Sequence, residues 1–482
     1  MRLKNNSSWV IILITLTLVG AFLRFYRLET LSTYLTDQAL ELLDTLAIIR
    51  GDIKLIGIKT SISEVRNGAV MNYLLIPFVY MFNYSPVAGG VLQSLLSLAT
   101  VPLVFLIGKR AKNELSGVIS AAVIALSPLL VEYSRQTQLA YYPLFFSSVV
   151  IFLLIKLTQK FENKFVILLG TLLGFVIQVH YLSFTLLILS LISIFVFMNR
   201  KNSFLLLAFG FLVGFAPLIL FELSHDFFNT KMFFNYLSSS SPEAGRLTTF
   251  NYFPQLFSRL IGANNIIIGW FVLIGMVFLL FARIRTNLSK AEKVFVVHIL
   301  ISIAVMAVFE GSLWYHYLLP TFVSIIVLGS TSIAWLVSRY KNLAVPLLIM
   351  GLSLIVINFP SYRLSADNGA YMSPGWNLKG VVKTANIISQ DVGGSSFNVA
   401  MLVDAQNQGY PLRYLLEVKN QKPLGISDYD KADNLYILVE PKLDLSSAFS
   451  NIYELNSFGG REVKSEWDIQ NGYKLVKISK SN

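Results

Sequence analysis

The residues best suited to chemistry lie in one charged segment, residues 28–68, which separates two apolar runs. A helix from Thr36 to about Arg50, capped by its threonine, would place Asp37, Glu41 and Asp44 at positions i, i+4 and i+7 on one face. A carboxylate there can act as a general base, taking a proton from an acceptor hydroxyl or amine that attacks a sugar carbon. The alternative is a solvated polar face, with Asp37 stabilising the positive end of the helix dipole.

Basic residues near these acids could bind a phosphate group. Arg135 follows an apolar run, and the planar donor fork of an arginine suits a phosphate. The alternative for Arg135 is an ion pair with Glu132 at the membrane interface. Lys54, Lys59 and Arg66 lie in the same segment as Asp37 and could serve a phosphate equally well.

Further polar and aromatic residues lie where other apolar runs end. His180, Glu222 and the Tyr315-His316 pair could contact a sugar or a lipid phosphate. Their alternatives are a hydrogen-bonded interfacial histidine, a solvated carboxylate and an aromatic belt. The complete set of expected substrate contacts is Gln38, Glu41, Lys54, Lys59, Arg66, Tyr133, Arg135, His180, Glu222, Tyr315 and His316. A divalent cation, Mg²⁺ or Mn²⁺, would take Asp37 and Glu222 as ligands, although no specific metal motif is present.

Composition places most of the chain in a membrane. The 482 residues are 55% hydrophobic and only 14% charged, whereas soluble domains average about 25% charged residues. The absence of cysteine excludes disulfides, thiol catalysis and cysteine metal sites. The net charge of +12 comes from lysines and arginines in short links between apolar runs, so it indicates membrane orientation and not nucleic-acid binding. No P-loop, dinucleotide fingerprint or serine-nucleophile elbow occurs, which argues against a nucleotide-driven pump and a soluble-type hydrolase.

The apolar runs and their basic links predict eleven transmembrane helices with a cytoplasmic N-terminus in the plasma membrane. The expected spans are 9–23, 87–108, 115–131, 140–157, 164–180, 181–198, 203–221, 262–282, 294–309, 315–336 and 343–359. The basic links then all lie inside, at Lys109–Lys112, Lys156–Lys164, Arg200–Lys201, Arg283–Lys293 and Arg339–Lys341. The apolar run 69–83 is short and contains Pro77, and counting it as a crossing would put the first basic link outside, so we expect it not to cross. Residues 24–86 therefore form the first outer loop.

The last part of the chain changes character after residue 360. Residues 375–390 read as a loop followed by a helix and 409–419 as another helix, while 397–403, 435–439 and 473–478 read as short strands. We therefore expect a transmembrane domain, 1–360, and an extracytoplasmic α/β domain, 361–482.

The order of these features resembles the multi-spanning glycosyltransferases of the GT-C fold, which include protein O-mannosyltransferases and lipid A aminoarabinose transferases. The similarity lies in an acid soon after the first span, in Thr36-Asp37-Gln38, then the stretch 72–77, the basic link at 108–110, and Ser127-Pro128 followed by Tyr133-Ser134-Arg135. The family pattern usually has Asp-Glu where this chain has Asp37-Gln38. It also has Pro-Pro or Gly-Pro where Gly68-Ala69 stands here.

The resemblance implies a membrane glycosyltransferase that moves a sugar from a polyprenyl-phosphate carrier to an acceptor on the outer face. The transfer would be an inverting displacement of a hexosyl or pentosyl group onto a glycan, lipid or protein. Asp37 would then be the general base, with Arg135 or a first-loop lysine facing the carrier phosphate. The rival prediction is a flippase or transporter of lipid-linked glycans, which should carry charges within its spans. The ionisable residues instead gather at the ends of the runs, which favours transfer chemistry at the outer face.

Overall fold

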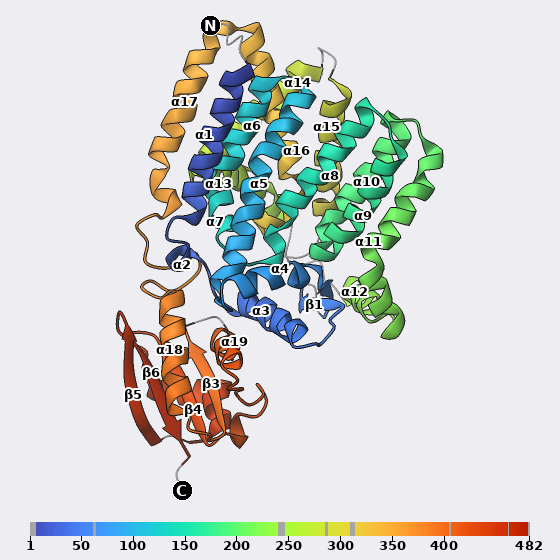
Figure 1. Ribbon diagram of the computed structural model, residues 1–482. Helices are drawn as coiled ribbons and strands as arrows, with labels where there is room; N and C mark the ends of the chain where they lie inside the picture. The colour runs from blue at the N-terminus through green and yellow to red at the C-terminus, as the bar shows by residue number, and fades with distance from the viewer. Residues whose placement is uncertain are drawn as a thin grey trace.

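A computed structural model describes residues 6–60, 64–239, 246–284, 288–308, 314–403, 406–460 and 462–480. A bundle of helices forms the larger part of the molecule, and a smaller part with a β-sheet carries the C-terminus (Figure 1). The elements of the first loop lie between the two parts, where α3 and β1 are labelled. Glu310, part of an expected outer turn, lies outside the described residues.

The helices of the bundle coincide with the apolar runs of the sequence, because a helix satisfies its own backbone hydrogen bonds in a lipid environment. They are α1 (Asn6–Phe25), α5 (Val87–Ala111), α6 (Glu114–Leu126), α7 (Pro128–Ser134), α8 (Pro143–Gln159), α9 (Asn163–Val179), α10 (Phe184–Ile192), α11 (Phe204–Ser224), α14 (Ile266–Ile284), α15 (Lys290–Val308), α16 (Leu319–Arg339) and α17 (Ala344–Ile357). Two further helices, α12 (Phe228–Ser239) and α13 (Arg246–Leu260), separate α11 from α14. Short helical turns η1 (Leu139–Tyr141), η2 (Tyr181–Ser183), η5 (Tyr315–Leu318) and η7 (Phe359–Tyr362) lie beside helix ends.

The expected count of eleven spans is not confirmed. Six helices in the described part of the chain are long and apolar enough to cross a membrane, or seven if the bent pair α6 and α7 is one span. Several of the other expected spans coincide with shorter apolar helices. The helix α4 (Val70–Met81) has 12 residues, a length of about 18 Å, whereas a bilayer core is about 30 Å thick. Its length agrees with the expectation that residues 69–83 do not cross.

A break between α6 and α7 brings the following segment toward the first loop. The two helices meet at an angle of 57° at Ser127, and Pro128 occupies the first position of α7, where a proline is compatible with a helix start. Arg24 of α1 is fully buried and donates to the carbonyl oxygens of Ile124 and Ala125, at 2.8 and 3.0 Å. The end of α6 is therefore capped from a neighbouring helix.

Helices α9 and α11 pack unusually closely. A Cβ atom placed on Gly214 would lie 2.0 Å from the carbonyl oxygen of Thr171, so only glycine allows this approach. The Nε2 atom of Gln178 donates to the carbonyl oxygen of Gly214 at 2.6 Å. This contact fixes the middle of α11 beside the C-terminal end of α9.

The first loop folds into α2 (Leu28–Leu31), α3 (Thr36–Ile49), the hairpin of β1 (Ile56–Lys59) and β2 (Arg66–Gly68), and then α4. The expected helix is present, but its cap differs from the prediction. Leu35 is the N-cap residue and Thr36 is the first helical residue. The side-chain oxygen of Gln38 accepts a hydrogen bond from the backbone nitrogen of Leu35 at 2.9 Å, which satisfies a donor before the first turn.

The C-terminal part contains a four-stranded sheet in the order β3, β4, β6, β5. Its strands are β3 (Phe397–Leu402), β4 (Asn434–Val439), β5 (Glu462–Gln470) and β6 (Tyr473–Ser479), and its helices are α18 (Leu378–Asp391), α19 (Tyr410–Val418), α20 (Leu445–Asn451) and α21 (Tyr453–Phe458). Strands β3 and β4 are parallel, with Phe397 opposite Asn434, and the remaining pairs are antiparallel. The sequence predicted β3, β4, β6, α18 and α19, but β5 was not expected because its residues are largely charged and exposed.

The helix α19 joins the C-terminal part to the first loop. The hydroxyl group of Tyr34 donates to the carbonyl oxygen of Pro411 at 3.2 Å, and that of Tyr414 donates to the carbonyl oxygen of Tyr84 at 2.9 Å. Nearby, Arg50 at the end of α3 pairs with Glu417 at 3.2 Å. The C-terminal part is thus anchored on the loop that carries Asp37.

Candidate active site

A cavity of about 1220 Å³ lies where the bundle, the first loop and the C-terminal part meet. Its apolar side is formed by residues of α9, α10, α11 and α15, among them Ile177, Phe184, Phe215 and Val305. Its polar side comes from the first loop, from the segment after α7 and from α13. A space that joins an apolar side to a polar one suits an amphipathic ligand.

Asp37 and Gln38 lie on the polar side of this cavity, as the sequence predicts. The first turn of α3 carries Asp37, whose side chain is exposed, whereas Gln38 is only 3% exposed. The amide oxygen of Gln38 supplies the acceptor that a glutamate would supply in a capping box, without the charge. Asp37 therefore has no acidic neighbour at the next position.

The three carboxylates that were expected on one helix face lie in three different environments. Glu41 is 2% exposed and does not line the cavity; its Oε1 atom accepts a hydrogen bond from the backbone nitrogen of Leu139 at 2.9 Å. Asp44 forms an ion pair with Lys54, and neither residue lines the cavity. The expectation that Glu41 and Lys54 contact a substrate does not agree with these positions, because Glu41 is bonded to Leu139 and Lys54 is paired with Asp44.

The other two basic residues of the first loop differ in position. Lys59 lines the cavity and forms a half-exposed ion pair with Glu64 at 2.6 Å. Arg66 does not line it. Instead, the backbone nitrogen of Arg66 donates to Asn229 Oδ1 at 2.9 Å, and its carbonyl oxygen accepts from the hydroxyl group of Tyr181 at 2.6 Å. Arg66 thus joins the hairpin to α12 and to the end of α9 through its backbone.

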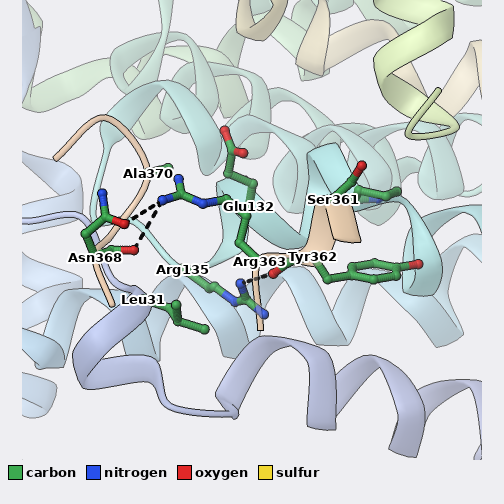
Figure 2. Close-up of a pocket in the computed structure, with 9 residues that line it drawn as sticks. Leu31, Glu132, Arg135, Ser361, Tyr362, Arg363, Asn368 and Ala370 are labelled. Atoms are coloured by element: carbon green, nitrogen blue, oxygen red, sulfur yellow. Dashed lines mark hydrogen bonds between the residues drawn. The ribbon is translucent and has the colours of Figure 1, made fainter. Parts of the chain in front are cut away.

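Arg135 lies outside the large cavity, in contrast to the expected phosphate contact. Its guanidinium group donates to the carbonyl oxygen of Leu23 at the end of α1 and to that of Tyr362 at 2.9 Å (Figure 2). The side chain is 4% exposed and lines a separate pocket of about 10 Å³. A water molecule needs about 10–15 Å³, so this pocket has no room for a phosphate group. Arg135 caps buried carbonyl groups. The sequence could not reveal this role, because the carbonyl groups belong to distant parts of the chain.

Glu222 lines the cavity, but its carboxylate is already engaged. Its two oxygen atoms accept hydrogen bonds from the backbone nitrogens of Asn229 and Thr230, each at 3.1 Å. These residues lie in the first turn of α12, which begins at Phe228, so Glu222 acts as a cap for that helix. Among the residues that the structure describes, no group of three or more His, Asp or Glu side chains could hold a metal ion.

Aromatic and imidazole rings form one wall of the cavity. Tyr133 stacks on Tyr141 with ring centroids 4.1 Å apart, and Tyr141 meets His316 edge to face at 5.9 Å. His316 in turn lies 6.2 Å from His180, again edge to face. The predicted residues Tyr133, His180, Tyr315 and His316 all line the cavity. Stacked rings of this kind provide apolar faces for a sugar or for a lipid head group.

Arg259 is the main cavity residue that the sequence analysis missed. It lies at the end of α13 and lines the cavity, with its guanidinium group 4.8 Å from the centre of the Tyr315 ring. It also hydrogen-bonds with the hydroxyl group of Tyr371, which interacts with Glu132 as well. One signal could have found it: Arg259 is a basic residue in an expected outer loop, directly before an expected span, against the positive-inside rule.

The C-terminal part also contributes to the cavity. Tyr371 precedes α18, and Gln406 lies in the connection between β3 and α19. Gln136 and Gln138, from the segment after α7, complete the polar side and were not singled out from the sequence. Among the described residues, the charged side chains of the lining are Asp37, Lys59, Glu222 and Arg259.

Comparison with known proteins identifies a family for one stretch of the chain. Residues 67–222 match the family of dolichyl-phosphate-mannose-protein mannosyltransferases. This match covers less than half of the chain. No curated protein sequence matches the chain.

Solved structures match the chain over nearly its whole length. ArnT from Cupriavidus metallidurans bound to undecaprenyl phosphate is 10% identical, with a TM-score of 0.64 over 98% of each chain. An oligosaccharyltransferase of Archaeoglobus fulgidus in complex with zinc and sulfate is 11% identical, with a TM-score of 0.56 over 88% of this chain and 67% of that one. AglB from the same organism, in complex with an inhibitory peptide and a dolichol-phosphate, is 11% identical, with a TM-score of 0.52 over 89% of this chain and 69% of that one. These similarities establish the fold.

Proposed function

Because the chain has the GT-C fold of multi-spanning membrane glycosyltransferases, we propose that it transfers a sugar from a polyprenyl-phosphate carrier to an acceptor. The observation that carries this proposal is the cavity itself, in which Asp37 lies with two basic residues on the polar side of an otherwise apolar space. The donor is amphipathic in the same way, with a charged phosphate, a sugar and a long apolar tail.

The apolar side of the cavity suits the first isoprene units of the carrier. Phe184 on α10 is 51% exposed and also lines the cavity, so this side continues to the outer surface of the bundle. A lipid could therefore keep its tail in the bilayer while its head group enters between α9, α10 and α11. Bound undecaprenyl phosphate in ArnT and dolichol-phosphate in AglB support a donor of this class.

Arg259 and Lys59 are the residues that we assign to the donor phosphate. Both line the cavity, whereas Arg135 and Lys54 are engaged elsewhere. The guanidinium fork of Arg259 can give two parallel hydrogen bonds to one phosphate, and Lys59 can add a point charge. These two residues replace Arg135 as the expected contacts of the carrier.

Asp37 is assigned as the general base of the transfer. It would accept the proton of the acceptor hydroxyl or amine as that group forms a bond to C1 of the sugar. The bond between C1 and the phosphate oxygen breaks, and polyprenyl phosphate leaves with the electron pair. A single displacement of this kind inverts the anomeric carbon. Tyr371 and Gln406 lie on the side of the C-terminal part, and we assign the approach of the glycan, lipid or protein acceptor to that side.

In this proposal Arg259 and Lys59 supply positive charge for the leaving phosphate. The proposed location is the plasma membrane, with a cytoplasmic N-terminus and the residues after 360 on the outer face. The basic links of the sequence support this orientation.

The test compares the wild type with Asp37→Asn and with Asp52→Asn, a matched change at an exposed acid of the same loop. Purified protein in lipid nanodiscs would be incubated with synthetic polyprenyl-phosphate sugars and a cell-envelope extract as acceptor. We expect Asp37→Asn to lower the transfer rate by about 10²- to 10⁴-fold, the usual contribution of a general base, and Asp52→Asn to leave it unchanged. Absence of transfer by the wild type, or a full rate for Asp37→Asn, would overturn the assignment.

A further inference from the structure

Glu41 lies one helical turn after Asp37 and has no role in the transfer described above. Its carboxyl group is buried beneath the cavity and does not reach the substrate space. A buried carboxyl group is uncommon in proteins because burial removes its hydration. Its surroundings therefore identify what the group holds in place.

The carboxyl group joins α3 to the turn that forms part of the cavity wall. Its Oε1 atom accepts a hydrogen bond from the backbone nitrogen of Leu139 at 2.9 Å, at the start of η1. Leu139, Ala140 and Tyr141 all line the cavity. The residues that precede these two segments are also joined, by a parallel β-bridge between Thr33 and Gln136. We call these two contacts, the Glu41–Leu139 hydrogen bond and the Thr33–Gln136 bridge, the clasp between the Asp37 helix and the cavity wall.

The helix side of this clasp is also fixed. The Nδ2 atom of Asn72 in α4 donates to the carbonyl oxygen of Glu41 at 2.8 Å, and to the hydroxyl group of Thr45 at 3.2 Å. The backbone of α3 at Glu41 is therefore held by α4 while its side chain holds η1. A displacement of η1 would change the position of the cavity wall relative to Asp37.

The titratable groups around Glu41 disfavour its ionised form. Burial raises its pKa to about 8, the hydrogen bond from Leu139 opposes this shift, and the negative charges of Asp37 and Asp44 add to it. Tyr142, next to η1, is a further titratable neighbour of Glu41. Near neutral pH, Glu41 is therefore mainly protonated, and Asp37 has no second charge beneath it.

Resting on the proposed transfer reaction, we propose that Glu41 is a positioning residue whose carboxyl group clasps the Leu139–Tyr141 turn to the Asp37 helix, and that a negative charge on this buried group slows transfer. An ionised Glu41 would still accept the hydrogen bond from Leu139, but it would place a buried negative charge one turn below the base. This charge would oppose the negative charge that develops on the leaving phosphate, which the proposed reaction places in the adjoining cavity.

The first test is the dependence of kcat on pH, between pH 6 and 9.5, for the wild type, Glu41→Gln, Glu41→Ala and the control Asp52→Asn. If transfer requires one protonated group whose titration midpoint is near pH 8, kcat should fall about tenfold from pH 7 to pH 9. Gln keeps an acceptor for Leu139 and cannot ionise, so Glu41→Gln should lose this decline. Glu41→Ala removes the clasp, and we expect its kcat to fall at every pH with little change in the KM of the donor. A wild-type decline that persists in Glu41→Gln, or a normal kcat in Glu41→Ala, would overturn the proposal.

The second test is thermal unfolding, which needs no substrate. The pKa of Glu41 in the folded protein is raised above its ordinary value of 4.5, so the folded state binds more protons than the unfolded state between about pH 4.5 and 8. The stabilisation is complete below this window and is lost as the pH rises through it. The Tm of the wild type should therefore fall relative to that of Glu41→Gln across this window, and parallel curves would overturn the proposal.

The two tests distinguish a failure of the proposed transfer function from a failure of the proposed role of Glu41. Absence of transfer in every variant, together with the expected difference in Tm, would reject the proposed function while the buried, protonated clasp stands. Transfer that is normal in the wild type, with identical pH profiles for wild type and Glu41→Gln, would reject the role of Glu41 alone.

Discussion

We propose Arg259, in place of the expected Arg135, as the contact of the donor phosphate, and a pair of substitutions tests this assignment. Arg135→Met should destabilise the fold without weakening donor binding, because its guanidinium group caps the carbonyl oxygens of Leu23 and Tyr362 and lies outside the cavity. Arg259→Met should weaken donor binding without destabilising the fold, because Arg259 is exposed at the cavity and its neighbours remain in place.

The magnitudes follow from the contacts. Loss of Arg135 leaves the carbonyl oxygens of Leu23 and Tyr362 without their donor, and a buried unsatisfied group costs about 1–3 kcal/mol, so the expected loss of stability is about 2–6 kcal/mol. Substitution of an exposed residue such as Arg259 usually changes stability by less than about 0.5 kcal/mol. A charge-assisted contact with phosphate contributes about 1.5–3 kcal/mol, which corresponds to a rise in the donor KM of about 10- to 150-fold.

The assay measures Tm and the donor KM on the same preparations, with Arg110→Met as a control for the loss of one basic residue at an exposed position. Arg259→Lys should recover part of the affinity, because it restores the charge but not the planar fork. The reasoning would be refuted if Arg135→Met raised the donor KM at unchanged Tm, or if Arg259→Met left the KM unchanged.

Two further predictions concern the walls of the cavity. Glu222→Ala removes the cap of α12 and should cost about 0.5–2 kcal/mol locally, seen as faster hydrogen exchange in the peptide 229–236, while Glu222→Gln should be intermediate; unchanged exchange in both variants would show that the cap is not needed. Gly214→Val should separate α9 from α11, because a Cβ atom there meets Thr171 at 2.0 Å, and should lower the stability by about 1–3 kcal/mol or more, measured as a fall in Tm. Gly351→Ala is the matched control, since no atom lies within 4 Å of a Cβ at that position; an equal effect of both substitutions would contradict the packing argument.

The sequence predicted the helical bundle well because hydrophobic runs are a local property. Each expected run corresponds to a helix, and the short run around Pro77 forms the short helix α4. The number of spans could not be settled in this way, since α6 and α7 divide one run with a bend of 57°. Their boundary depends on Pro128 together with Arg24, which reaches it from another helix.

In the candidate site too, the sequence predicted local features but not the contacts that depend on how the chain folds back on itself. Helical periodicity placed Asp37 on an exposed face, and the structure places it in the cavity. The same periodicity grouped Glu41 with Asp37, although Glu41 is buried against Leu139, which is far away in the sequence. Glu222 was expected at a substrate or a metal ion, but its partners are backbone nitrogens only seven and eight residues later, and the turn that brings them back is not visible in a pattern of apolar residues.

The sequence by itself thus predicted which apolar runs form helices, that a charged segment follows the first of them, and that Asp37 lies in the first turn of the helix in this segment. These properties depend on hydrophobicity, charge and helical periodicity, which are read over a few turns of chain. Only the tertiary structure decided which polar side chains face the cavity. An arginine bonds to a carbonyl group or remains available to a ligand according to which helix ends lie beside it, and for Arg135 and Arg259 those neighbours come from distant parts of the chain.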